Sequence, residues 1–227
     1  DWEKEGGCIG DNTHLKTLYI EKCIRRDDKH VREKNRAFFR AVARNRSITD
    51  LIIDGNKAHT GDMFAIGILP FLENSSRLRN LDLCNFDMDT KSNMDIVTAL
   101  SRCNKQSLQR LEFHCLSGMD DESAAKLIDA VAMHRNISDL MLGFNDIVGR
   151  QWIVALGNLL QKPASQLVDL NIAHNSIGNE AAAVLGNALA KNKTLEDLDL
   201  DYNAIGDEGA AALGNSLADN KTLKNLS

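Results

Sequence analysis

Residues 195–206, with the sequence LEDLDLDYNAIG, decide the fold of this chain. Leu195, Leu198 and Leu200 follow the spacing L-x-x-L-x-L, and the last two alternate with polar residues at the period of two that a half-buried strand requires. Asn203 closes the pattern, and an Ala-rich segment with apolar residues at helical spacing follows it at residues 207–217. The stretch therefore predicts a short strand, a turn and a helix.

The same pattern occurs at residues 167–178 (LVDLNIAHNSIG), and weaker copies extend it toward both ends of the chain. The units begin at Leu15, Ile48, Leu78, Leu108, Ile137, Leu167, Leu195 and Leu223, at intervals of 28 to 33 residues. A period of this size indicates a stack of repeats, in which each unit buries its apolar face against its neighbours.

The ninth position of the repeat holds Asn in four units, at Asn56, Asn145, Asn175 and Asn203. We expect these side chains to hydrogen-bond the backbone of neighbouring turns and to form a ladder. The ladder is predicted to weaken where the ninth position holds Cys23, Phe86 or Leu116. The first interval is the longest, which predicts a longer strand-to-helix loop through residues 25–29.

These motifs, above all residues 177–181 (IGNEA) and 205–210 (IGDEGA), resemble the ribonuclease-inhibitor-like class of leucine-rich repeats over nearly the whole chain. The resemblance implies an α/β fold, a leucine-rich repeat solenoid shaped as a horseshoe. It places a parallel β-sheet on the concave face and α-helices on the convex face. Because the motif specifies the scaffold and not the partner, three functions follow: a protein–protein interaction scaffold, which we favour, a GTPase-activating regulator of the same fold, or a structural subunit of a larger complex.

Residues 1–227 are expected to form a single domain of about seven repeats with partial units at both ends. Residues 1–14 match the end of an earlier unit's helix, and residues 223–227 stop within an eighth strand. Because a solenoid needs polar terminal caps, we expect the chain to be a fragment of a longer protein.

The composition is that of a globular protein, with 43% hydrophobic and 26% charged residues. No apolar run approaches the roughly 20 residues that cross a bilayer, so we expect no membrane partner. The five cysteines (Cys8, Cys23, Cys84, Cys103 and Cys115) are an odd number without close pairs, which favours reduced thiols in the cytoplasm, with the nucleus as an alternative.

Six glycosylation sequons begin at Asn45, Asn74, Asn136, Asn192, Asn220 and Asn225. Five of them directly precede the first strand residue of a unit, so the repeat consensus alone generates them. Glycosylation in a secreted protein is the weaker interpretation.

The third, fifth and seventh positions of each unit point away from the core, and together they predict the concave face. Ten of these 23 positions are acidic and one is basic, Arg110. Adjacent strands lie ~4.8 Å apart, so the carboxylates form a negative field that attracts a basic protein surface and repels nucleic acid. The alternative is that the acidic residues serve only solubility.

At the eighth position three successive units carry aromatic residues, either as part of an interface or as packing against the next loop. The predicted partner-binding residues on the concave face are therefore Asp139, Asp169, Asn171, Asp197, Asp199, Asp201, Phe144, His174 and Tyr202.

Residues 22–46 hold ten Lys/Arg and three acidic residues, which gives this segment a charge of +7. Because the whole chain carries −5, the remaining residues carry −12. This basic helix, with Phe38 and Phe39 on its inner face, is either a solvated surface, which we favour, or a contact for an acidic partner, RNA or another subunit. Cys84, His114 and Cys115 fall near the strand ends of adjacent units, but their spacing matches no known metal motif. We expect no catalytic residues, cofactor, metal or small-molecule substrate, because the phosphate-binding, metalloprotease and nucleophile-elbow motifs are absent from the sequence.

Overall fold

The computed structural model describes residues 2–21, 37–59, 61–102 and 107–227. The strands are β1 (Thr17–Glu21), β2 (Asp50–His59), β3 (Asn80–Asp87), β4 (Arg110–Ser117), β5 (Asp139–Met141), β6 (Asp169–Asn171), β7 (Asp197–Asp199) and β8 (Asn225–Leu226). The helices are α1 (Trp2–Asp11), α3 (Gly61–Asn74), α4 (Thr90–Arg102), α5 (Asp121–Val131), α6 (Gln151–Gln161), α7 (Asn179–Leu189) and α8 (Asp207–Leu217).

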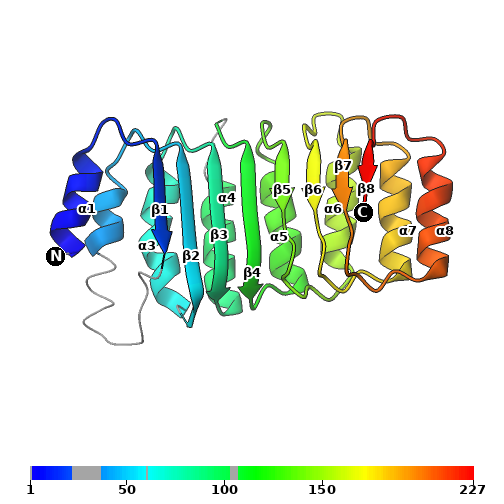
Figure 1. Ribbon diagram of the computed structural model, residues 1–227, viewed down its shortest axis with the longest axis horizontal. Helices are drawn as coiled ribbons and strands as arrows, with labels where there is room; N and C mark the ends of the chain where they lie inside the picture. Colours follow the sequence, from blue (N-terminus) through cyan, green and yellow to red (C-terminus); the bar gives the residue numbers. More distant parts are fainter. Residues whose placement is uncertain (1, 22–36, 60, 103–106) are drawn as a thin grey trace.

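The eight strands form one open parallel sheet in the order of the sequence, and the helices form a second layer on one face of it (Figure 1). Paired strands are ~4.8 Å apart whereas packed helices need 8–10 Å, about twice as much. The helix layer is accordingly longer than the strand layer (Figure 1), which places the strands on the inner side of the curve. The fold is a leucine-rich repeat solenoid, as predicted.

The L-x-x-L-x-L positions form the core between the two layers. In β7, Leu198 is buried between Asp197 and Asp199, whose side chains point to the other face. The first residue of the pattern is also buried, as at Leu167 and Leu195. Small residues let the helices approach closely: a Cβ atom on Gly186 would lie 2.8 Å from Ser216 Oγ of α8.

The Asn ladder forms as predicted in the units of β5 to β7. Asn175 Nδ2 donates to the Leu142 carbonyl of the preceding unit at 2.9 Å, and to the Ile172 carbonyl of its own unit at 3.1 Å. Its Oδ1 accepts the Ile147 N–H at 3.0 Å. Asn145 and Asn203 make equivalent contacts.

Where the ninth position is apolar, strand pairing replaces the ladder. Phe86 and Leu116 are both 1% exposed, and they pair in register as β3 and β4 continue to Asp87 and Ser117. The strands of these two units are therefore eight residues long, whereas β5 to β7 have three residues each. Where the Asn ladder was predicted to weaken, the backbone N–H and C=O groups are therefore paired between strands instead of with an Asn side chain. Cys23 and the Asn56 side chain lie outside what the structure describes.

Helix α1 precedes the first strand, and β8 pairs with β7. The predicted long loop and most of the basic segment lie outside the described residues. Phe38 and Phe39, within helical residues 37–42, are buried as predicted. Within the described part of the chain, no helix is long and apolar enough to cross a membrane.

Two of the sequon asparagines have structural roles. Asn45 Nδ2 donates to the Ile9 and Asn12 carbonyls at 2.6 and 2.7 Å, and Asn192 Nδ2 donates to the Leu160 carbonyl at 2.7 Å. Both residues are buried. A glycan on either nitrogen would break the turn that leads into the next strand.

We predict that Asn175→Ala lowers the free energy of unfolding by about 2–3 kcal/mol, because buried carbonyl and N–H groups lose their partner. Urea unfolding followed by circular dichroism measures the change. Ser176→Ala, at the exposed neighbouring position, is the control and should change stability by less than about 0.5 kcal/mol. Equal stability of the two variants would contradict the role of the ladder.

Candidate functional site

The strand register brings the predicted concave-face residues into columns. The third-position column pairs Arg110 with Asp139, Asp139 with Asp169, and Asp169 with Asp197 on successive strands. The fifth-position column pairs Asn171 with Asp199. These side chains are half-buried, whereas Asp201 is exposed. The structure therefore brings together all of the predicted acidic residues.

Charge is distributed unevenly along this face. Arg110 contacts Glu112, and its Nη1 lies 3.6 Å from Asp139 Oδ1. In the units beyond that of Arg110, toward the C-terminus, the three columns hold Asp139, Asp169, Asp197, Asp199 and Asp201 and no Lys or Arg. The carboxylates over β6 and β7 therefore have no cation beside them in these columns, whereas those of β4 and β5 contact Arg110.

Hydrogen bonds fix part of this acidic group. Asn171 Nδ2 donates to Asp199 Oδ2 at 2.8 Å, and Asn171 Oδ1 accepts the Ala173 N–H at 3.0 Å. Asp199 Oδ1 accepts the Asp201 N–H at 3.0 Å. Both residues are thus held in one orientation across two strands, which pre-organises the surface for a ligand.

The negative charge of Asp169 is destabilised by its position among the other carboxylates. Partial burial raises the pKa of its carboxyl group, and repulsion from Asp139 and Asp197 raises that pKa further. Arg110 acts in the opposite direction. The carboxylates are thus gathered at some cost to the folded state, a common property of functional sites.

The three aromatic residues of the eighth position form a continuous stack. The Phe144 and His174 rings lie 3.9 Å apart with an interplanar angle of 18°, and the His174 and Tyr202 rings lie 4.1 Å apart at 14°. Phe144 is 50% exposed and Tyr202 is 76% exposed. The stack therefore presents aromatic surface to solvent.

Strand spacing and backbone conformation together produce the stack. Phe144, His174 and Tyr202 all have positive φ angles, of 61°, 51° and 55°. The Phe144 N–H donates to the Ala173 carbonyl and the His174 N–H to the Asp201 carbonyl, so each unit holds the next. The residues at the same position of the two preceding units, Asn85 and Cys115, also have positive φ angles, of 58° and 54°, so the left-handed conformation belongs to the turn of the repeat. The turn therefore places the eighth-position side chains of successive units side by side, and three of these units carry an aromatic residue there.

A hollow of about 650 Å³ lies at the Phe144 end of the stack. Its lining includes Phe86, Leu116, Met119, Phe144 and Asp146. The repeat pattern of the sequence did not predict this hollow. The sequence feature that could have indicated it is the apolar ninth position at Phe86 and Leu116. These residues lie in the long strands β3 and β4, next to the short strands β5 to β7.

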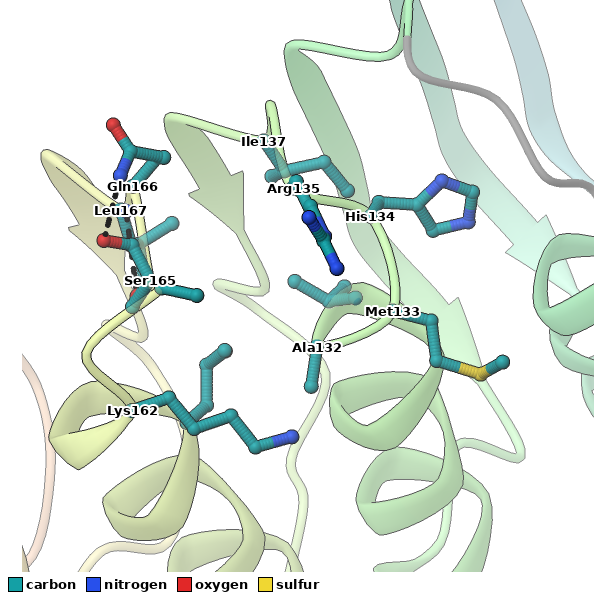
Figure 2. A pocket seen from close by; sticks show the side chains of 12 residues that line it. Ala132, Met133, His134, Arg135, Ile137, Lys162, Ser165, Gln166 and Leu167 are labelled. Carbon is teal, nitrogen blue, oxygen red and sulfur yellow. Dashed lines mark hydrogen bonds between the residues drawn. The ribbon is translucent and has the colours of Figure 1, made fainter.

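A second hollow, of about 380 Å³, lies where the α5 and α6 units turn from helix into strand (Figure 2). Figure 2 shows Arg135 and Lys162 reaching toward it from adjacent units, with Ser165 on its far side. No sequence pattern indicated this hollow. Its two cations give it a character opposite to that of the acidic columns.

Cys84 and His114 approach each other as the sequence allowed, but the third member of the group is Asp82 rather than Cys115. One ligand atom from each of Asp82, Cys84 and His114 lies within 4.8 Å of the other two. Burial raises the pKa of the Cys84 thiol to about 12, with Asp82 and Asp54 adding to the effect. The contact with Asp82 raises the pKa of His114.

The Leucine Rich repeat family model matches residues 166–186 and 191–214, which belong to the units of β6 and β7. A comparison with curated protein sequences gives no significant match. The family match supports a leucine-rich repeat family, while the ribonuclease-inhibitor-like class stays a prediction.

Solved structures with the same fold include an internalin from Listeria monocytogenes, with a TM-score of 0.56 and 20% identity over 96% of this chain and 49% of that one. The tropomodulin C-terminal domain of Caenorhabditis elegans has a TM-score of 0.52 and 17% identity, over 63% of this chain and 83% of that one. A structure of leiomodin-1 actin-binding site 2 has a TM-score of 0.52 and 17% identity, over 58% and 75%. At these identities the likeness shows the fold alone.

We predict that Asp169→Asn stabilises the chain at pH 7 by a few tenths of a kcal/mol, because it removes a carboxylate repelled by its cross-strand neighbours and screened only in part by solvent. The folded-state pKa is raised, so the charge costs stability above that pKa and nothing at acidic pH, where the group is protonated in both states. The stability gain should therefore grow as pH rises from acidic to neutral.

Thermal unfolding at a series of pH values measures this gain. Asp219→Asn, at an exposed position outside the sheet, is the matched control and should give no comparable gain. A loss of stability at pH 7 for Asp169→Asn would contradict the account of the acidic columns.

Proposed function

We propose that this chain is a protein–protein interaction scaffold that binds a basic protein partner on its concave face. The partner-binding residues are the acidic surface (Asp139, Asp169, Asn171, Asp197, Asp199 and Asp201) and the aromatic stack (Phe144, His174 and Tyr202). The single observation that carries this proposal is the solvent-exposed stack of three aromatic rings beside clustered carboxylates.

The two surfaces adjoin because the seventh and eighth positions are neighbours in each unit. Asp201 and Tyr202 are consecutive and both exposed. A guanidinium group can stack on an aromatic face while it pairs with a carboxylate. Arginine-rich partner surfaces therefore fit both parts of the site, and lysine-rich ones fit the carboxylates alone.

The hollow beside Phe144 is a pocket in which a side chain of the partner can be buried, which a flat charged surface does not offer. Affinity at interfaces comes largely from a few side chains buried in pockets, while charge sets the association rate and the choice of partner. An apolar side chain of the partner would occupy the space between Met119 and Phe144, both of which line the hollow. The acidic surface would then orient the partner along β6 and β7.

A charge-reversal variant tests the acidic surface. We expect that changing Asp169, Asp197, Asp199 and Asp201 to Lys removes a partner captured from native extract by the unmodified chain. The control variant changes Glu73, Asp129, Glu180 and Asp219 to Lys, which reverses as many charges at exposed positions on the helix side. Loss of the same partner in both variants, or in neither, would contradict binding on the concave face.

A second variant tests the aromatic stack without changing the charge. Tyr202→Asn removes an exposed ring and replaces it with a residue that tolerates the left-handed conformation. We expect a change in the free energy of unfolding of no more than about 1 kcal/mol, because lost stacking and relieved strain offset each other.

Binding of the captured partner to the Tyr202→Asn variant should weaken about 10-fold or more, as at an interface hot spot. Surface plasmon resonance measures the affinity. Undiminished affinity would assign the stack a structural role. Raising the salt concentration should slow association to the unmodified chain, because exposed charges are screened.

A further inference from the structure

A separate group of side chains lies on the concave face nearer the N-terminus. Asp82 and Cys84 are two residues apart on β3, so both point to the same face of the sheet. His114 of β4 pairs in register with Cys84. The sheet thus brings a carboxylate, a thiol and an imidazole together, with their ligand atoms within 4.8 Å of one another.

One carboxylate oxygen of this group has no hydrogen-bond donor in the part of the chain that the structure describes. Asp82 Oδ1 is buried and accepts no hydrogen bond from any described residue. Its nearest charged neighbour is His114 Nε2 at 3.4 Å, which is too long for a good hydrogen bond. A buried carboxylate oxygen without a donor is costly and calls for a cation or a water.

We propose that Asp82, Cys84 and His114 form a Zn²⁺ site with three protein ligands. Carboxylate oxygen, thiolate sulfur and imidazole nitrogen are the three ligand types that zinc takes in proteins. The thiolate disfavours Mg²⁺ and Ca²⁺, which prefer oxygen ligands alone. On binding, the Cys84 thiol proton is released to solvent and the metal takes its place.

The geometry is close to what zinc requires. Bond lengths of about 2.0–2.3 Å in a tetrahedron place ligand atoms roughly 3.3–3.6 Å apart. The Asp82 Oδ1–His114 Nε2 pair is already 3.4 Å apart. The remaining pairs are at most 4.8 Å apart, so at most about 1.5 Å separates them from this spacing.

The surroundings favour a divalent cation as well. Asp54 lies beside Cys84 in the strand register, and Glu112 lies beside Asp82, so two further carboxylates flank the site. The Cys84 thiol donates a weak hydrogen bond to the Ile53 carbonyl at 3.8 Å, and this bond is lost when the metal replaces the thiol proton. Asp82 and His114 are half-buried, so solvent reaches part of the group, and water would supply a fourth ligand.

Metal titration of the purified full chain under reducing conditions tests the site. Calorimetry with Zn²⁺ should detect one tight equivalent. Co²⁺ alone should give the thiolate-to-cobalt charge-transfer absorption together with the intense d–d bands of a tetrahedral site. Cys84→Ser should abolish the charge-transfer absorption. Asp82→Asn and His114→Gln should each weaken zinc binding by more than the roughly 10- to 100-fold that loss of an outer-shell contact costs.

Cys115→Ser is the matched control, since it removes the neighbouring thiol on β4 and leaves the three ligands in place. It should retain both the cobalt spectrum and the zinc affinity, and circular dichroism checks that each variant is folded. A charge-transfer absorption that is absent from the unmodified chain, or that survives Cys84→Ser, would overturn the proposal. Unchanged zinc affinity in the folded His114→Gln variant would overturn it as well.

Discussion

Each strand of the sheet pairs with the next at the same position of the repeat, from Thr17 with Asp50 at one end to Asp197 with Asn225 at the other. This register is constant over the L-x-x-L-x-L segment and aligns its columns, and it shifts only farther along, between β2 and β3 after Asp54. It buries the leucines in one layer, directs the intervening residues to the concave face, and sets neighbouring carboxylates about one strand spacing apart. A slip of one residue in any unit would exchange core and surface positions, so core and face depend on the same pairing.

The register also explains why chemically distinct groups occur on a single face. Stacking identical positions brings like charges together, at a cost that falls on Asp169. It brings Phe144, His174 and Tyr202 into contact although about 30 residues separate each from the next. Nearer the N-terminus, the same rule places Cys84 beside His114. The solenoid thus supplies positions, and the residues that occupy them decide between partner binding and metal binding.

The sequence predicted where the strands and their side chains lie better than it predicted how the apolar residues around them pack. Its periodicity located the strands, the buried leucines, the ladder of Asn145, Asn175 and Asn203, and the aligned acidic columns, because these follow from spacing alone. It did not predict that β3 and β4 would lengthen around Phe86 and Leu116, nor the hollow beside them, since both depend on how apolar residues pack. It also paired His114 and Cys84 with Cys115, whereas side-chain direction selects Asp82.

The central claim, that the acidic surface and the aromatic stack bind a basic protein surface together, is tested most directly by nuclear magnetic resonance of the labelled chain with an arginine-rich peptide. The account predicts perturbed amides at Phe144, His174 and Tyr202 and at the acidic residues of β6 and β7. It also predicts upfield shifts of the peptide's arginine side-chain signals, caused by the aromatic rings. Perturbations confined to the helices, or arginine signals that do not move, would contradict it.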